Sequence, residues 1–291
     1  MRKATAQALL SIPLILLIAA AIAWAGSQGG QRFGGFPVFA LCGVLCFALN
    51  WLVFVHAYAA QTERYFDLTG SLTYFTVIAC AVTLGNRDPR ALLLALLVGV
   101  WALRLGTFLF RRIRREGADR RFDALKPSFA RFLLTWTLQG LWVFLTVACA
   151  LAAITAAATE PLGALAGLGT AVWVAGFAIE AIADLQKGVF RADPDNRDRF
   201  ITSGLWAWSR HPNYCGEILL WIGVALIALP ALSGWALVTL ISPIFVYVLL
   251  TRISGIPLLE SRSDAKWGDD PEYQAYKRRT PVLWLRPPAA T

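Results

Sequence analysis

Long runs without a charged side chain constrain the fold of this chain more than any other feature. Residues 218–251 contain no Asp, Glu, Lys or Arg at all. Hydrophobic residues make up 57% of the chain and charged residues only 15%, whereas a soluble domain carries roughly 25% charge. Because a helix of about 20 apolar residues crosses a bilayer, the sequence predicts an all-α polytopic membrane protein.

The apolar runs divide into eight predicted transmembrane helices. The third run is short and is expected to extend into residues 66–70, and a turn-like break at residues 230–234 divides the last two. The predicted spans are residues 8–25, 36–58, 71–85, 91–110, 132–158, 162–183, 213–230 and 234–251. The first span also has the features of a signal peptide, with an A-x-A-like site at residues 23–25, and its removal would leave seven spans.

The distribution of basic residues predicts the orientation. With the N-terminus inside, 23 of the 27 Lys and Arg fall in the inside segments, as the positive-inside rule requires. Both termini are therefore expected in the cytoplasm, and the predominance of Arg over Lys favours a bacterial inner membrane. The net charge of +9 is explained by topology and contacts with membrane lipids, so no nucleic-acid partner is expected.

The sequence lacks the usual signatures of metal and nucleotide sites. The five cysteines lie in or beside the spans without a CxxC pair, so no metal site is expected and they are interpreted as small packing residues. No Walker A, GxGxxG or HExxH motif occurs, so a bound nucleotide would not use a Rossmann domain. We expect residues 1–291 to form a single membrane domain that is a monomer.

Residues 204–217 place a dense polar segment at the mouth of the seventh span. Pro212 favours the first turn of a helix, because its missing N–H costs nothing there. Asn213 and Glu217 then share one helix face, and the helix N-terminus together with Arg210 can hold a phosphate. The structural alternative for the tryptophans of this segment is an interfacial aromatic belt.

Two further polar clusters are expected at the same cytoplasmic face. Glu180, Asp184 and Lys187 lie at i, i+4 and i+7 of a helix, either as a solvated helix end or as part of a site. In the tail, Tyr273 and Tyr276 recur on a short amphipathic helix. This helix is interpreted either as a membrane-surface anchor or as a lid that supplies hydroxyls to a cofactor.

A weaker cluster precedes and enters the third span. Glu63, Asp67 and Tyr74 lie at i, i+4 and i+11, which would place them on one side of a helix. A carboxylic acid near a phenol can polarise a carbonyl, although a structural role fits these residues equally well. Arg104 lies inside the fourth span and must face a partner or water.

Three ordered motifs occupy the C-terminal third of the chain. They are Asp184-Leu185-Gln186-Lys187-x-x-Phe190-Arg191-x-Asp193-Pro194, then Ser203-Gly204-Leu205-Trp206 with Arg210-His211-Pro212-Asn213-Tyr214-x-Gly216-Glu217, and Tyr273-x-x-Tyr276. Residues 184–291 thereby resemble the C-terminal half of the membrane steroid and sterol reductases. The whole chain, including residues 61–70, more closely resembles the DUF1295 family, which is related to steroid 5α-reductases.

The resemblance implies an NADPH-dependent reductase. In such enzymes hydride reaches the β-carbon of an enone, an acid hydrogen-bonds the carbonyl, and the α-carbon is protonated. Residues 132–291 would bind NADPH and residues 1–131 a lipophilic, steroid-like or terpenoid substrate from the bilayer. The family motifs do not place the groups that polarise its carbonyl, and we expect Glu63 and Tyr74, or Asp67 as a substitute, in that role from their own chemistry. The cofactor contacts that the resemblance implies are Lys187, Arg191, Asn196, Arg210, His211, Asn213, Tyr214, Glu217, Tyr273 and Tyr276. We expect Asp184 and, from the fourth span, Arg104 to join them.

Two other functions stay open. An isoprenylcysteine-carboxyl-methyltransferase-like enzyme using S-adenosylmethionine shares the Arg-His-Pro-x-Tyr-x-Gly core, but its tail is expected to carry a Glu-Glu pair where this chain has Glu260-Ser261. A non-catalytic lipid-binding or scaffold protein is the second alternative. The density of polar residues at the spans disfavours it, because unused polar groups in a bilayer cost stability.

Overall fold

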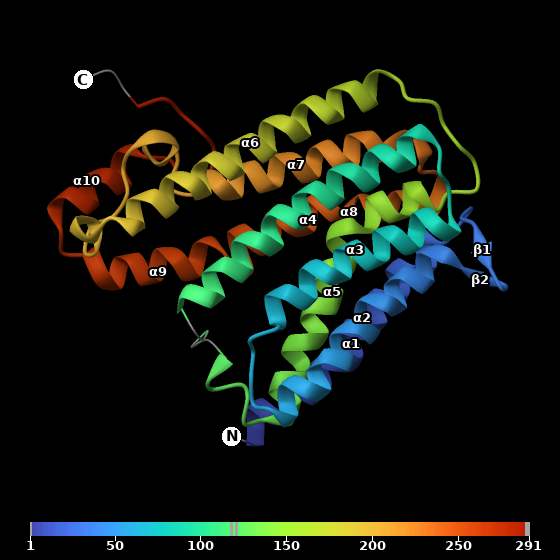
Figure 1. The fold of residues 1–291 in the computed structure, drawn as a ribbon, viewed down its shortest axis with the longest axis horizontal. Coiled ribbons are helices and arrows are strands. Elements are labelled where there is room, and N and C mark those ends of the chain that lie inside the picture. Colours follow the sequence, from blue (N-terminus) through green and yellow to red (C-terminus); the bar gives the residue numbers. More distant parts are fainter. Residues whose placement is uncertain (1, 117–118, 120–121, 289–291) are drawn as a thin grey trace. The chain divides into compact units, whose positions relative to one another are not determined.

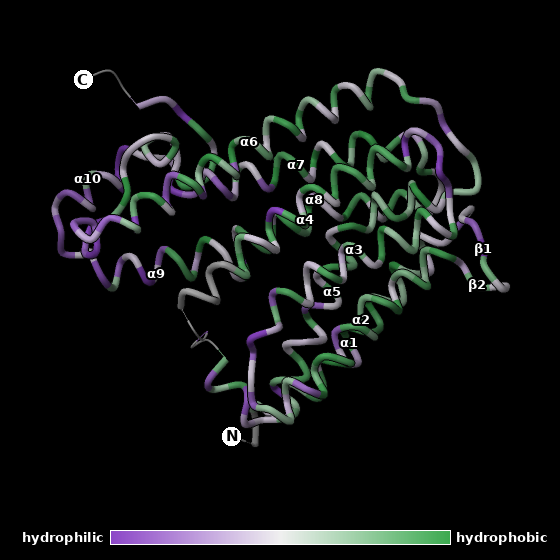
Figure 2. Tube along the Cα trace, in the orientation of Figure 1, coloured by the Kyte–Doolittle hydropathy of each residue, from purple (hydrophilic) through white to green (hydrophobic). Residues whose placement is uncertain are grey.

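The computed structural model describes residues 2–116, 119 and 122–288, and nearly all of its regular structure is helical (Figure 1). Among these described residues, eight helices are long and apolar enough to cross a membrane, which confirms the predicted all-α polytopic fold. They are Ala4–Gly26, Val38–Ala59, Phe66–Leu84, Pro89–Phe110, Phe129–Ile154, Ala164–Ala192, Pro212–Ala231 and Gly234–Trp267. In Figure 2, hydrophobic residues follow these helices and hydrophilic residues gather in the loops and tail.

The helix limits differ from the predicted spans where polar residues continue a helix. Helix α3 (Phe66–Leu84) includes the expected extension, and α7 (Pro212–Ala228) begins at its proline as predicted. Helix α6 (Ala164–Ala192) continues nine residues past the predicted end at 183, because a helix need not end where its hydropathy falls. The last span starts as a 3-10 helix, Gly234–Leu240, before α8 (Ile241–Val248) and a π-helical turn, Leu249–Ile253.

The chain divides into two compact units. The first unit comprises Met1–Ala166 and Ala225–Ser242, and the second comprises Gly167–Val224 and Pro243–Thr291. The first contains α1 (Arg2–Gly26), α2 (Val38–Ala59), α3, α4 (Pro89–Glu116) and α5 (Phe129–Ile154). Helix α5 packs against the other four and is almost entirely buried, so it forms the core of this unit.

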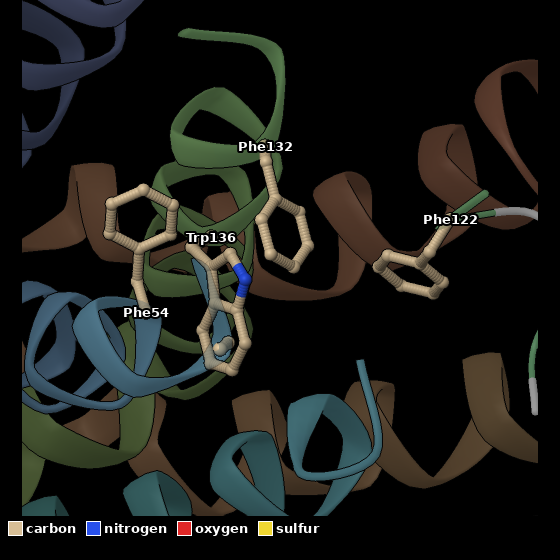
Figure 3. Packing of buried hydrophobic residues seen from close by; sticks show 5 residues of the cluster. Phe54, Phe122, Phe132 and Trp136 are labelled. Carbon is tan, nitrogen blue, oxygen red and sulfur yellow. The ribbon is translucent and has the colours of Figure 1, made fainter. Parts of the chain in front are cut away.

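An aromatic cluster joins the loop before α5 to helices α2 and α5 (Figure 3). Phe54 and Trp136 each meet Phe132 edge-on, with ring centroids 5.8 and 6.1 Å apart, and Phe122 also packs against it. Each such pair contributes about 0.5–1.5 kcal/mol beyond its buried area. The cluster therefore fixes residues 122–136 against α2.

At the opposite end of the first unit, polar contacts tie the connecting segments together. The buried Arg90 donates to the backbone carbonyls of Glu160, Pro161 and Ile227. Because these three carbonyls satisfy the guanidinium, Arg90 can be buried without needing a carboxylate.

A short antiparallel hairpin, β1 (Arg32–Phe33) and β2 (Phe36–Pro37), follows α1.

The second unit is built on closely packed α6 and α7. A Cβ added to Gly216 of α7 would lie 2.5 Å from the backbone of Glu180 and Gly176 on α6, and one on Gly223 would meet the Gly169 carbonyl at 2.6 Å. Such small-residue contacts let two transmembrane helices approach closely. The remaining elements are the 3-10 helices Pro194–Asn196 and Gly204–Ala207, then α9 (Ile256–Trp267) and α10 (Pro271–Arg279). The last of these confirms the predicted short helix in the tail.

Candidate functional site

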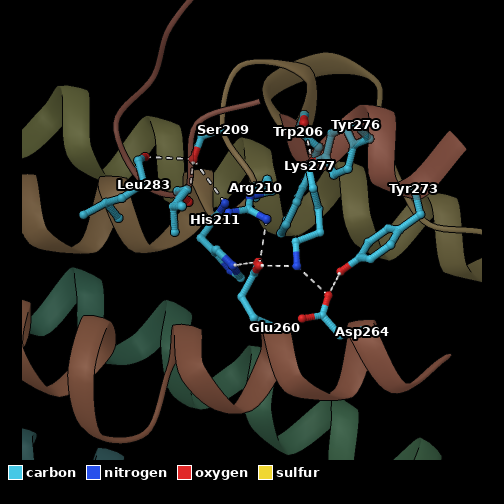
Figure 4. A network of polar contacts seen from close by, with 11 residues as sticks. Trp206, Ser209, Arg210, His211, Glu260, Asp264, Tyr273, Tyr276, Lys277 and Leu283 are labelled. Carbon is cyan, nitrogen blue, oxygen red and sulfur yellow. Dashed lines mark hydrogen bonds and ion pairs between the residues drawn. The ribbon is translucent and has the colours of Figure 1, made fainter. Parts of the chain in front are cut away.

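A charged cluster in the second unit is centred on the carboxylate of Glu260, on α9 (Figure 4). An Arg210 amino group lies 2.7 Å from one carboxylate oxygen and His211 Nε2 lies 2.8 Å from the other. Lys277 Nζ, from α10, lies 3.7 Å from the same carboxylate. Groups from two segments, residues 210–211 and α10, therefore converge on one anionic side chain of α9.

A second carboxylate on α9 connects this cluster to α10. Asp264 lies one turn after Glu260, and it accepts hydrogen bonds from Lys277 Nζ at 2.6 Å and from the Tyr273 hydroxyl at 3.0 Å. Burial and this contact with Asp264 raise the pKa of Tyr273 to about 12. Tyr273 is therefore protonated at neutral pH and its proton is used to join α10 to α9.

Backbone contacts hold residues 206–211 against the tail. The hydroxyl of Tyr276 donates to the Trp206 carbonyl at 2.7 Å, and the Arg210 amide donates to the Pro281 carbonyl at 2.8 Å. Ser209 donates to the carbonyl of Leu283 and accepts from the amide of His211. These bonds fix the backbone of the segment that carries Arg210 and His211.

Burial leaves His211 neutral and with one acceptor atom. Burial lowers the pKa of its imidazole below the ordinary value, although the hydrogen bond with Glu260 opposes this shift. A carboxylate only accepts, so Nε2 carries the proton and Nδ1 has a lone pair. His211 Nδ1 and Arg210 Nε are buried and have no hydrogen-bond partner among the described residues, so an acceptor and a donor remain available to a ligand.

The predicted residues of α6 and α7 meet beside this cluster. Asn213 donates to Asp184 at 3.2 Å, and the Tyr214 ring stacks on the imidazole of His211 with centroids 5.7 Å apart. The ammonium group of Lys187 lies over the Trp206 ring, 4.3 Å from its centroid, which is the geometry of a cation–π contact. Glu217 lies one turn after Asn213, as its spacing predicted, whereas Arg191 is exposed near the end of α6.

A pocket of about 710 Å³ lies on the other face of α10. This volume is within the range of about 300–1,000 Å³ that is usual for ligand sites. Of the predicted cofactor residues it includes Asn196. Its lining residues are Phe190, Asn196, Asp198, Arg199, Phe200, Thr202, Asp270, Glu272, Ala275 and Arg279.

The two faces of α10 have different roles. Glu272, Ala275 and Arg279 line the pocket, whereas Tyr273 and Tyr276 are buried on the side that contacts Asp264 and Trp206. Burial also raises the pKa of Tyr276. Both predicted tyrosines thus use their hydroxyls within the protein, and the exposed residues of α10 are Pro271, Glu272, Arg278 and Arg279.

The predicted substrate-side residues lie in the first unit. The assumption that Glu63, Asp67 and Tyr74 share one helix side is wrong for Glu63, because α3 begins only at Phe66, after a turn in which Gln61 has a φ of 48°. Asp67 is half-buried in the first turn of α3, and Tyr74 is buried with its ring edge-on to Trp101 at 5.1 Å.

The carboxylate of Glu63 forms an ion pair within the first unit. Its two oxygens accept from Lys126 Nζ at 2.8 Å and from the Asp119 amide at 2.9 Å. Burial opposes ionisation, but these hydrogen bonds outweigh it and hold the pKa of Glu63 below its ordinary value. Arg104, predicted as a cofactor contact, is half-buried on α4 of the first unit.

Glu260, Asp264 and Lys277 are the residues that sequence reasoning left out of the site. The sequence patterns predicted no site role for Glu260, which was only compared with the Glu-Glu pair expected in methyltransferase tails. The sequence contains two signals for these residues. Glu260 and Asp264 lie at i and i+4 just after the last apolar run, so they share one helix face, and Lys277 directly follows Tyr276. Which side chains they would contact depends on segments about 50 positions away, so spacing alone did not reveal it.

Comparison with known proteins agrees with the family predicted from the motifs. A family model described as a protein of unknown function (DUF1295) matches residues 53–280. The match includes the region of Glu63 and Tyr74 as well as the whole Glu260 cluster. No curated protein and no solved structure matches the chain.

Proposed function

We propose that this chain, which belongs to the DUF1295 family, is an NADPH-dependent reductase in the membrane. Its reaction would reduce a carbon–carbon double bond conjugated to a ketone in a lipophilic, steroid-like or terpenoid substrate from the bilayer. The observation that supports it most is the cluster at the start of α7, where Arg210 and His211 are held with unused polar atoms. The predicted relation to steroid 5α-reductases provides the reaction class.

The residues present fit a dinucleotide with several phosphates. The donor Nε of Arg210 and the acceptor Nδ1 of His211 are buried polar atoms that a ligand would satisfy. Lys187 and Arg191 add positive charge on α6. The pocket beside α10 contains Arg199 and Arg279 but also Asp198, Asp270 and Glu272, so it adds no net positive charge.

When bound, NADPH would supply the hydride, and the chain's task is to bind and orient it. Asn213 and Asp184, which bond to each other, together with Tyr214 and Glu217, are the proposed polar contacts on α6 and α7. Asn196 is the proposed contact from the pocket, and Tyr273 and Tyr276 would hold α10 in place through their bonds to Asp264 and Trp206.

Among the substrate-side candidates, Tyr74 fits carbonyl polarisation best. A hydrogen-bond donor is needed where negative charge develops on the carbonyl oxygen as hydride reaches the β-carbon, before the α-carbon takes a proton. Glu63 is ionised and both of its oxygens accept hydrogen bonds, so it lacks a proton to donate. Asp67 is the proposed substitute.

The test is thermal stability of the detergent-purified protein with NADPH, NADH or S-adenosylmethionine. A ligand at 100 times its dissociation constant adds about 2.7 kcal/mol of stability, which gives a clear shift. Asn213→Ala, which removes the contact to Asp184, is expected to weaken the NADPH shift. Gln274→Ala is the matched control, because it removes an amide hydrogen bond to the Gly268 carbonyl in the same unit.

Each ligand separates one hypothesis from the others. A shift with NADPH that Asn213→Ala weakens and Gln274→Ala preserves would support the reductase, and screening of enone steroids for turnover would follow. A shift with S-adenosylmethionine alone would replace the reductase by the methyltransferase hypothesis. No shift with any ligand would favour the non-catalytic lipid-binding alternative.

A further inference from the structure

Helices α1 and α2 lie side by side in the first unit (Figure 1). Residues of both helices line an apolar groove. Its volume is about 700 Å³. Small side chains create it, since Ala19, Ala20 and Ala23 of α1 oppose Ala40 and Gly43 of α2. Both helices belong to predicted spans, so hydrocarbon rather than water surrounds the groove.

The lining changes from apolar to polar along the groove. From Leu16 to Trp24 the residues of α1 that line it have no hydrogen-bonding side chain except the tryptophan indole. Ser27, Gln28 and Arg32 line the other end. The hydroxyl of Ser27 already donates its proton to the Ala23 carbonyl, so it is not free to donate to a ligand in the groove.

The length of the groove along α1 matches the hydrocarbon thickness of one leaflet. At about 1.5 Å per residue, its lining from Leu16 to Ser27 extends about 17 Å along α1. One leaflet contributes about 15 Å of the hydrocarbon core of a bilayer. The exposed Trp24 and Trp235, whose rings lie 5.6 Å apart, mark the polar end as the headgroup level, because tryptophan is enriched there.

A cation at the headgroup level identifies the chemistry of the occupant. The exposed Arg32 uses its Nε to donate to the Gly35 carbonyl at 3.0 Å, and it forms no ion pair within the described part of the chain. Its two terminal amino groups therefore remain to donate to an anion, and a phosphate accepts from both at once.

We propose that this groove binds one anionic phospholipid, with an acyl chain between α1 and α2 and the phosphate at Arg32. The length matches a single chain from one leaflet, the apolar walls match hydrocarbon, and the unpaired guanidinium matches a net negative headgroup. This site is separate from the Glu260 cluster and does not depend on the proposed reductase activity.

The test measures lipid retained by the full-length protein after purification from equal mixtures of phosphatidylglycerol and phosphatidylethanolamine, by native mass spectrometry. One basic residue near an anionic surface corresponds to about a fivefold preference for the anionic lipid. Arg32→Gln is expected to abolish that preference. Arg87→Gln is the matched control, because Arg87 is also exposed and bonded to backbone carbonyls but does not line the groove.

A second variant tests the acyl-chain part of the groove. Ala20 is exposed to the groove, so Ala20→Phe fills it from a position that tolerates a larger side chain, and less lipid of either headgroup should be retained. The proposal is overturned if Arg32→Gln keeps the preference for phosphatidylglycerol, if Arg87→Gln loses it equally, or if Ala20→Phe retains as much lipid as the wild type.

Discussion

Removing the charge of Glu260 should destabilise the second unit strongly, because this carboxylate neutralises Arg210 in a half-buried setting. Glu260→Gln keeps the side-chain volume but loses the ion pair. The Glu260 side chain is 21% exposed and that of Arg210 only 11%, so water screens the contact poorly. The amide of the variant has only one acceptor oxygen, so it can no longer accept from both Arg210 and the Nε2–H of His211.

The magnitude follows from the partial burial. Two unit charges about 4 Å apart attract by about 4 kcal/mol at an effective dielectric constant of about 20, and desolvation offsets much of this gain. Hydrogen bonds to charged groups contribute about 1.5–3 kcal/mol net. We expect a coupling energy of about 2 kcal/mol between Glu260 and Arg210.

The assay is a double-mutant cycle on reversible unfolding in mixed detergent micelles, using Glu260→Gln, Arg210→Gln and the double variant. The matched control is a cycle on Asp198 and Lys266, whose contact of 3.0 Å is similar in length but whose side chains are 86% and 45% exposed. Exposed pairs contribute about 0–1 kcal/mol. A coupling for Glu260 and Arg210 no larger than that of the control would refute the central role of this carboxylate.

Two further predictions concern helix packing and pH. Gly216→Ala should destabilise the protein by about 1–3 kcal/mol in chemical unfolding, because the added Cβ would overlap the backbone of Glu180. The control Gly188→Ala, at a position with open space around it, should be neutral or stabilising. Equal effects of the two substitutions would contradict the close packing of α6 and α7. Lys126 and a backbone amide lower the pKa of Glu63 from 4.5, so its stabilisation is complete above pH 4.5 and is lost as the pH falls through the folded-state pKa. Melting temperatures below pH 4.5 should therefore fall less steeply in Glu63→Gln than in the wild type, and parallel profiles would contradict the assignment.

Local features of the sequence predicted the elements of the site better than their contacts. The helix start at Pro212 and the helix around Tyr273 and Tyr276 follow from residue preferences that act over a few positions. The placement of Glu63 on the third helix failed, because residues 60–65 form a turn held by a partner from another loop, Lys126. Local spacing contains no information about such a partner.

The sequence by itself determined the membrane class and the eight spans, because a backbone in hydrocarbon must satisfy its own hydrogen bonds and long apolar runs can do so only as helices. Only the tertiary structure decided that Glu260 neutralises Arg210 and accepts a hydrogen bond from His211, that the tyrosines of α10 bond to the protein, and that α1 and α2 leave a groove. These features depend on which side chains of distant segments meet. That outcome is set by packing across the whole unit, whereas helix formation is set by the residues of one segment and their solvent.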